Sequence, residues 1–208
     1  MIIAVDGPTA SGKGTIARAL AAHFGLPHLD TGLLYRAVGQ LCMLNGGDPD
    51  DPADALAACA FTDALLADPA LRTEETGALA SRVSVHPAVR RALYERQRGF
   101  ATQPGGAVLD GRDIGTVITP EAEAKLFVTA SVYARAERRF LEMQGRGLPV
   151  TLDEIEADLA RRDERDRSRK EAPLVAAADA RMLDNSDLSA EASIAEAIRL
   201  VEASIGRR

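Results

Sequence analysis

A glycine-rich segment near the N-terminus constrains the fold of this chain more than any other feature. Residues 7–15 have the sequence GPTASGKGT, and they lie between the apolar run Ile2–Val5 and an amphipathic stretch over 15–24. A short apolar run of this kind is typical of a strand buried on both faces, and Gly25 is a helix stop signal. The segment is therefore expected to join a buried strand to the start of a helix.

That context gives the spacing G-x-x-x-x-G-K a chemical meaning. Backbone N–H groups of such a loop can wrap a phosphate chain at the positive end of the helix. Lys13 would add a compact charge at the β- and γ-phosphates, and a hydroxyl from Thr15, less readily from Ser11, would face Mg²⁺ directly or through water. The alternative is a chance glycine-rich turn. The expected triphosphate-binding residues are Gly7, Pro8, Thr9, Ala10, Ser11, Gly12, Lys13, Gly14 and Thr15.

Apolar runs and amphipathic stretches continue to alternate along the chain, which predicts an α/β fold with a parallel five-stranded sheet flanked by helices. Strands are expected at 2–5, 26–29, 107–109, 125–129 and around 182–183. Helices are expected at about 15–24, 33–44, 132–144 and 152–170, and 48–104 is expected to be mostly helical. Strands ending at Asp6, Asp30 and Asp110 should meet at one rim of the sheet, where ligands bind. Asp6 or Asp110 would hold Mg²⁺ through water there, or Asp6 would bind loop backbone instead.

Composition excludes several classes of function. The 208 residues carry 25 Lys and Arg against 31 Asp and Glu, and this net charge of -6 argues against a general nucleic-acid or membrane-surface binder. No stretch is long and apolar enough for a membrane span, and the N-terminus lacks the pattern of a signal peptide. Cys42 and Cys59 form no metal-ligand or disulfide pattern. We therefore expect a cytoplasmic monomer with no obligate partner.

Three further segments carry groups suited to a second substrate. Residues 29–36 have the sequence LDTGLLYR, residues 108–116 have VLDGRDIGT, and residues 162–174 have RDERDRSRKEAPL. Together with the glycine-rich segment, they resemble the bacterial cytidylate kinases (CMP/dCMP kinases) from residue 2 to about residue 188. The resemblance implies a P-loop kinase core with a monophosphate-binding region and a short lid.

The resemblance also implies boundaries within a single kinase domain, residues 1–208. The core would comprise about 1–45, 105–131 and 175–208, the monophosphate-binding region about 46–104, and the lid about 132–172. Some members of the family carry a small sheet insertion, but residues 48–80 show no β-rich segment. We therefore expect an abbreviated monophosphate-binding region.

The activity implied by the resemblance is transfer of the γ-phosphoryl group of ATP to CMP or dCMP, with Mg²⁺ as cofactor. Ser81, Arg90 and Asp113 would bind the cytosine. The other residues implied at the acceptor site are Thr31, Tyr35, Arg36, Arg112, Arg162, Asp166 and Arg169. The residues implied to be catalytic are Lys13, Arg112, Arg162 and Arg169.

The hydrogen-bonding pattern of cytosine supports two of these assignments independently. A carboxylate suits the N4 amino donor, and an arginine fork suits the O2 and N3 acceptors. Asp113 and Arg90 are the right chemical types for that pair. The same carboxylate would face O4 of uracil, acceptor against acceptor, so the site would reject UMP.

The arginine-rich helices have two interpretations. Arg162, Asp166 and Arg169 recur on one helix face, a pattern that a solvated, salt-bridged helix also shows. The resemblance favours substrate contacts for these three and leaves Arg161, Arg165 and Arg167 as surface charge. Arg135 and Arg139 in the preceding helix are either lid arginines on the ATP phosphates or members of an exposed face; Arg139 is the one expected to bind ATP. Thr151 and Glu154 form a candidate capping box.

Competing functions share the same core. One is another small-molecule kinase, acting on shikimate, gluconate or a different monophosphate, and another is a non-catalytic nucleotide-binding regulator. Arg90 and Asp113 argue against the first, and the intact Lys13 and acceptor arginines argue against the second. A GTPase switch is disfavoured because the chain has no N-K-x-D motif.

Overall fold

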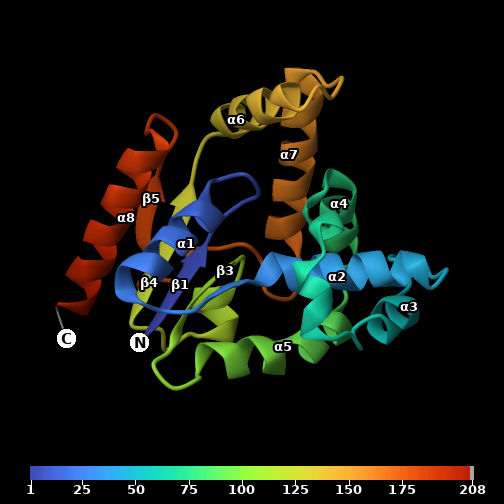
Figure 1. Ribbon diagram of the computed structural model, residues 1–208, viewed down its shortest axis with the longest axis horizontal. Coiled ribbons are helices and arrows are strands. Elements are labelled where there is room, and N and C mark those ends of the chain that lie inside the picture. The colour runs from blue at the N-terminus through green and yellow to red at the C-terminus, as the bar shows by residue number, and fades with distance from the viewer. Residues whose placement is uncertain (207–208) are drawn as a thin grey trace.

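A five-stranded parallel sheet forms the centre of the computed structural model, which describes residues 1–206 (Figure 1). The strand order is β2-β3-β1-β4-β5, and every pairing is parallel, which confirms the predicted fold class. The strands are β1 (Ile2–Asp6), β2 (His28–Asp30), β3 (Ala107–Gly111), β4 (Ala124–Thr129) and β5 (Arg181–Asp184). β2 begins later than expected because Pro27 has no N–H to donate to a ladder.

β1 lies at the middle of the sheet and is buried on both faces. Ile3 and Val5 pack on one side with α1 (Lys13–Phe24) and α8 (Ala190–Ile205), whereas Ala4 packs on the other side. That second face is covered by α5 (Pro87–Ala101) and by the π-helical turn η3 (Ile114–Ile118). This alternation explains why the run is apolar throughout. Helix α8 was not among the helices predicted from the sequence.

A second apolar core lies beside the sheet, among the helices that follow β2. It joins α5 to α2 (Thr31–Leu44), α3 (Pro52–Ala57) and α4 (Glu74–Val83). Leu34, Val38 and Leu93 are fully buried in it. Two short 3-10 turns, η1 (Asp63–Ala67) and η2 (Pro69–Arg72), complete the segment. Residues 48–104, all of which the structure describes, contain no strand, as the sequence pattern predicted.

A pair of helices, α6 (Val132–Gly145) and α7 (Leu152–Ser168), stands over the carboxyl ends of the strands (Figure 1). The predicted capping box starts α7: the Glu154 N–H donates to Thr151 Oγ1 at 3.3 Å, and the Thr151 N–H donates to Glu154 Oε2 at 3.0 Å. α7 ends at Ser168, earlier than expected, because Arg169 adopts an extended conformation. Over residues 1–206, no helix has the length and apolarity to cross a membrane.

Candidate active site

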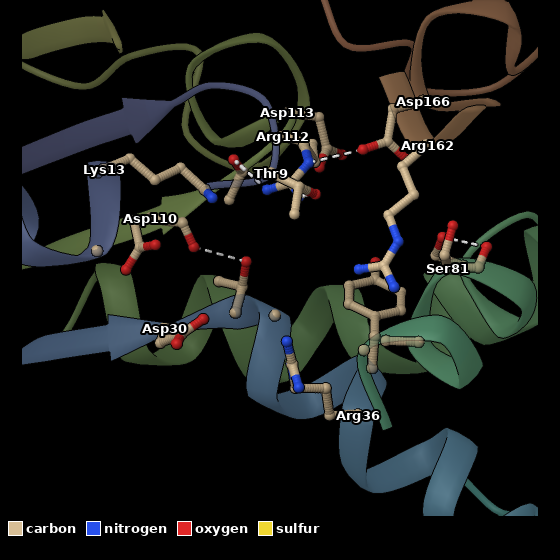
Figure 2. Close-up of a pocket in the computed structure, with 18 of the residues that line it drawn as sticks. Thr9, Lys13, Asp30, Arg36, Ser81, Asp110, Arg112, Asp113, Arg162 and Asp166 are labelled. Carbon is tan, nitrogen blue, oxygen red and sulfur yellow. Dashed lines mark hydrogen bonds and ion pairs between the residues drawn. The ribbon is translucent and has the colours of Figure 1, made fainter. Parts of the chain in front are cut away.

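A cavity of about 240 Å³ opens at the carboxyl ends of the central strands, between the glycine-rich loop, α2, α4 and the α6–α7 pair (Figure 2). Asp30 of β2 and Asp110 of β3 are register partners, and Val5 of β1 lies opposite Asp110. The expected meeting of strand ends at one rim is thus confirmed. The carboxylates of Asp30 and Asp110 both line the cavity.

The loop between β1 and α1 depends on two glycines. A Cβ at Gly7 would lie 2.0 Å from the carbonyl oxygen of Val128, so no side chain fits between the loop and β4. Gly12 has a φ of 81° and caps α1, a conformation that other residues adopt at a cost. The two glycines therefore shape the loop rather than face the cavity.

Four loop residues line the cavity: Thr9, Ala10, Lys13 and Gly14. The other expected triphosphate-binding residues, Gly7, Pro8, Ser11, Gly12 and Thr15, do not line it. Thr15 is exposed at the start of α1, where its hydroxyl accepts a hydrogen bond from Arg18 at 3.2 Å. The Ser11 hydroxyl is buried and has no hydrogen-bond partner.

Lys13 projects from the first turn of α1 toward the two strand-end carboxylates (Figure 2). Burial, reinforced by the positive charge of Arg112, lowers the pKa of Lys13 to about 8, while Asp110 and Asp30 act in the opposite direction. Its Nζ has one internal acceptor, the carbonyl oxygen of Pro8 at 3.4 Å. The ammonium group is therefore only weakly held within the protein and faces the cavity.

All the residues that the sequence analysis assigned to the acceptor line this same cavity. They are Thr31, Tyr35, Arg36, Ser81, Arg90, Arg112, Asp113, Arg162, Asp166 and Arg169. They come from α2, α4, α5, the segment after β3 and the end of α7, so the tertiary structure gathers groups that are far apart in sequence. Arg139 of α6 lines the cavity as well.

Arg90 and Asp113 form an ion pair in the wall of the cavity, with side chains only 9% and 7% exposed. The Arg90 guanidinium also lies over the ring of Tyr35, 5.6 Å from its centroid. Burial raises the pKa of Tyr35, so its hydroxyl stays protonated. The pair presents a carboxylate and an arginine fork side by side, in a part of the cavity screened from water.

Asp166 of α7 binds two arginines. It accepts a hydrogen bond from Arg112 Nε at 2.8 Å and lies 3.1 Å from Arg169 Nη2. Burial opposes ionisation of Asp166, but these two arginines hold its pKa below the usual value. The carboxylate is therefore charged near neutral pH, and it orients both guanidinium groups at the cavity wall.

The remaining arginines of the cavity wall are Arg36, Arg139 and Arg162, of which Arg162 is buried and the other two are partly buried. Arg36 donates to the carbonyl oxygen of Leu71 at 2.8 Å, and Arg162 pairs with Asp158 at 2.9 Å. Burial lowers the pKa of both. The positive charge of Arg162 further lowers the pKa of Arg36, and the positive charge of Arg112 further lowers the pKa of Arg162. Arg139 shares this effect and pairs with Glu74. Like charges so close together repel one another, and anionic groups bound among them would relieve that repulsion.

The structure corrects one interpretation of the lid helices and adds a contact to another. Arg135 is neither a cavity arginine nor part of an exposed face, because it is 1% exposed and pairs with Asp163 inside the helix pair. Arg165 is exposed, as expected for surface charge, but it also donates to the hydroxyl of Ser81 at 2.7 Å. Arg139–Glu74 and Arg165–Ser81 thus connect α6 and α7 to α4 beside the cavity.

Asp30 was predicted from the sequence only as a strand end, although its carboxylate lines the cavity. Burial, together with the negative charge of Asp110, raises the pKa of Asp30. The carboxylate of Asp110 accepts a hydrogen bond from His28 Nε2 at 2.7 Å. The register of β2 against β3 brings these groups together, so strand pairing was the signal that would have found them.

Asp6 binds backbone N–H groups, which is one of the two roles that the sequence allowed for it. Its carboxylate accepts hydrogen bonds from the N–H groups of Ile114 and Gly115, both at 2.8 Å, and it does not line the cavity. Burial raises its pKa to about 7, against the effect of these two bonds. Across residues 1–206 there is no cluster of three or more His, Cys, Asp or Glu side chains suited to a metal ion.

Comparison with solved structures supports the fold alone. A crystal structure of an uncharacterized protein from Eubacterium ventriosum aligns with a TM-score of 0.55 and 14% sequence identity, covering 100% of this chain and 99% of that one. The arrangement of strands and helices is therefore shared at low sequence similarity.

Comparison by sequence is more specific. The family model described as cytidylate kinase matches residues 3–203. A cytidylate kinase from Xanthobacter autotrophicus is 57% identical over 203 residues, covering 98% of each chain. Another, from Rhodopseudomonas palustris, is 56% identical over 204 residues, covering 98% of this chain and 97% of that one. On these grounds, the chain belongs to the cytidylate kinase family.

Proposed function

We propose that this protein transfers the γ-phosphoryl group of ATP to CMP or dCMP, giving ADP and CDP or dCDP. The observation that carries the proposal is one cavity that contains Lys13, the Arg90–Asp113 pair and a group of crowded arginines. Lys13 suits a triphosphate, the Arg90–Asp113 pair suits a cytosine, and the arginines suit the phosphates of both substrates. Membership of the cytidylate kinase family supports the same assignment.

The acceptor base would bind at the buried pair. Asp113 accepts from the N4 amino group of cytosine, and Arg90 donates to O2 and N3, with the hydroxyl of Ser81 alongside. Because Arg90 and Asp113 already pair with each other, both groups are held in place before the base arrives. This preorganisation lowers the entropy cost of binding and favours a base with the matching donor and acceptors.

The donor would bind along the glycine-rich loop, with its phosphates against the loop N–H groups and the charges of Lys13 and Arg139. Thr31, Tyr35 and Arg36 would enclose the acceptor from α2. Arg162, Asp166 and Arg169 would enclose its ribose and phosphate from the end of α7. Donor and acceptor phosphates then meet inside the arginine cluster.

Transfer requires positioning and charge neutralisation more than proton abstraction. The acceptor phosphate is already an anionic nucleophile near neutral pH, so no strong general base is needed. Lys13, Arg112, Arg162 and Arg169 would hold the two phosphates in line and stabilise the charge on the transferring group. Exclusion of water by α6 and α7 would limit hydrolysis of ATP.

The residues present fit a magnesium ion bound together with the donor. Asp30 and Asp110 are neighbouring carboxylates, and the burial and repulsion that raise the pKa of Asp30 would be relieved by a cation. Magnesium in such sites is usually held by one or two carboxylates, substrate phosphates and water, which agrees with the small number of acidic groups here. Asp30 and Asp110 would hold Mg²⁺, which neutralises phosphate charge when bound. The hydroxyl of Thr15, proposed from the sequence as a ligand, does not line the cavity and lies against Arg18.

The regional assignments follow from the same proposal. Residues of about 46–104 would form the monophosphate-binding region and about 132–172 the lid, within a single domain on a core of about 1–45, 105–131 and 175–208. We also infer a monomer in the cytoplasm, with no nucleic-acid or membrane partner. Size-exclusion chromatography with light scattering tests the monomer directly.

One assay tests the proposed function against its alternatives. ADP formation is measured with ATP and Mg²⁺ in parallel reactions containing CMP, dCMP, UMP, AMP or shikimate. We expect turnover with CMP and dCMP far above the other acceptors. Turnover with shikimate or AMP instead would support a different small-molecule kinase, and tight ATP binding without turnover would support a regulator.

A further inference from the structure

Two arginines contact the same residue of the glycine-rich loop, and each arginine is paired with a carboxylate of α7. Arg112 Nη2 donates to the hydroxyl of Thr9 at 2.6 Å, and Arg135 Nη1 donates to the carbonyl oxygen of Thr9 at 3.0 Å. Arg112 is held by Asp166 at 2.8 Å, and Arg135 is held by Asp163 at 3.1 and 2.5 Å. Both atoms of Thr9 that can accept a hydrogen bond are therefore connected to the same helix.

The Arg135–Asp163 pair is the deeper of the two. The side chains are 1% and 3% exposed, and Arg135 Nε also donates to the carbonyl oxygen of Ala130 at 3.0 Å. A buried pair is tolerable only when its hydrogen bonds are satisfied, and the loss of one partner leaves an uncompensated charge. Neither residue lines the cavity, so neither one touches a substrate. Their contact with Thr9 therefore acts on the loop itself.

The position of this contact in the loop is specific. Thr9 is followed by Ala10, which lines the cavity and has a φ of 61°, a conformation that is strained for a residue with a Cβ. The carbonyl and N–H of one peptide group point in opposite directions, so the hydrogen bond from Arg135 to Thr9 O fixes the direction of the Ala10 N–H. Ala10 N–H is thereby held on the side of the loop opposite Arg135.

We propose that Arg135 and Asp163 are positioning residues that fix the glycine-rich loop to α7, so that the donor loop and the acceptor-binding end of α7 keep one relative placement. Asp163 lies between Arg162 and Asp166 on that helix. The inference rests on the proposed function, because it matters only if the loop binds the donor and α7 binds the acceptor. It assigns no chemical step to either residue.

The test measures the Michaelis constants of the full-length protein carrying Asp163→Asn or Arg135→Lys. Asparagine removes the charge of Asp163 with little change of shape. Lysine keeps the charge of Arg135, but it lacks the planar guanidinium that hydrogen-bonds to Thr9 and Asp163 at the same time. We expect the KM for ATP to rise roughly tenfold or more, with a smaller rise for CMP. The double variant should show no further rise in KM for ATP, because both changes remove the same connection.

Two controls separate positioning from stability. Glu164→Gln removes the same charge from an exposed neighbour on α7, and Arg167→Ala removes an exposed charge 3.9 Å from Asp163. Both should leave the KM for ATP unchanged. A residue with only a structural role would lower the melting temperature and the active fraction, but the KM for ATP of the folded molecules would not move. That result in Asp163→Asn and Arg135→Lys overturns the proposal.

A paired replacement covers the case in which the single variants do not fold. Arg135→Met with Asp163→Leu replaces the buried pair by apolar groups, a change that proteins often tolerate. We expect this variant to fold and to bind a non-hydrolysable ATP analogue at least roughly tenfold more weakly than the unmodified protein. Normal affinity of the paired replacement for the analogue contradicts the inference. Failure of Asp163→Asn, Arg135→Lys and the paired replacement to fold also contradicts it, because the pair then has a structural role.

The same analogue distinguishes failure of this inference from failure of the proposed function. If the unmodified protein does not form ADP with any acceptor, the proposed function is wrong, but the affinity for the analogue still tests the connection between loop and helix. If the unmodified protein is active and the variants bind the analogue normally, the inference alone is wrong.

Discussion

Lys13 shows how the surroundings of a residue set its chemistry. A lysine in water is charged throughout the neutral range, but burial and the positive charge of Arg112 lower the pKa of Lys13 to about 8. Asp30 and Asp110 keep it from falling further. The ammonium group is therefore charged at neutral pH and loses its proton at a pH only slightly above neutral.

This pKa predicts a pH dependence of ATP use. Above about pH 8 the free protein loses the Lys13 charge, so kcat/KM for ATP should fall by roughly tenfold per pH unit. The kcat at saturating ATP should fall less, because bound phosphates stabilise the charged amine. Initial rates from pH 6 to 10 test this. A flat kcat/KM profile through pH 9 would show that Lys13 keeps its charge in the free protein over this range, against the lowered pKa.

A second prediction at the residue scale concerns the role of Asp113 in binding the base. Removal of its carboxylate in Asp113→Ala should raise the KM for CMP far more than the KM for ATP, since only the base loses a partner. The loss of one good base contact corresponds to about 1–3 kcal/mol, or roughly tenfold to hundredfold in the CMP-over-UMP preference. Kinetics with both acceptors measure this. A variant with the original preference would contradict the assignment.

At the scale of elements, the two ends of α7 differ in what determines them: neighbouring residues at its start and tertiary contacts at its end. Its start depends on the Thr151–Glu154 capping box, which involves only neighbouring residues and was predictable from sequence. Its end at Ser168 depends on Asp166, which binds Arg112 and accepts a backbone hydrogen bond from the Leu174 N–H. The helix therefore begins through local chemistry and ends where tertiary contacts hold the chain.

Loss of the capping box should reduce the stability of the protein by a modest amount. Thr151→Ala should destabilise the protein by about 1 kcal/mol, because the Glu154 N–H loses its acceptor. Thermal unfolding should show a melting temperature lower by a few degrees. The KM for CMP should not change, since Thr151 is exposed at the end of α7 away from Asp166. A large rise in that KM would show that the start of α7 reaches the cavity.

At the scale of the whole molecule, Asp6 joins the centre of the sheet to the segment that carries Arg112 and Asp113. Its carboxylate binds the N–H groups of Ile114 and Gly115, directly after that segment. Burial raises its pKa from an ordinary 3.8 to about 7. The folded protein therefore binds a proton at Asp6 over a pH range in which the unfolded chain does not.

The sign of the resulting stability change follows by linkage. Between about pH 4 and 7 the folded state holds more protons at Asp6 than the unfolded state, so this contribution to stability falls as pH rises and is lost above pH 7. Relative to Asp6→Asn, the unmodified protein should lose up to about 1.4 kcal/mol per pH unit across that window. Urea unfolding of both proteins from pH 4.5 to 8 measures the difference. A constant difference would show that Asp6 keeps an ordinary pKa.

Several parts of the molecule were predictable because their causes are local. The buried strand, the turn at Gly12 and the start of α1 depend on residues within one short segment, whereas Gly7 is required by the approach of Val128 on β4. The strand ends at Asp30 and Asp110 were also visible, because parallel strands bring their carboxyl ends to one rim. The acceptor residues were assigned by family resemblance, and the structure brings all of them to one cavity.

Arg135 and Arg139 show the limit of such reasoning. They stand one helical turn apart on α6 in the same local pattern, yet Arg139 lines the cavity and Arg135 is buried against Asp163 and Thr9. The sequence by itself determined the strand–loop–helix unit, the α/β order and the chemical types at the site, because these depend on local spacing. Only the tertiary structure decided which charged groups face the cavity and which hold the loop in place. Helical periodicity assigns residues to a face, but burial of that face depends on the elements packed against it.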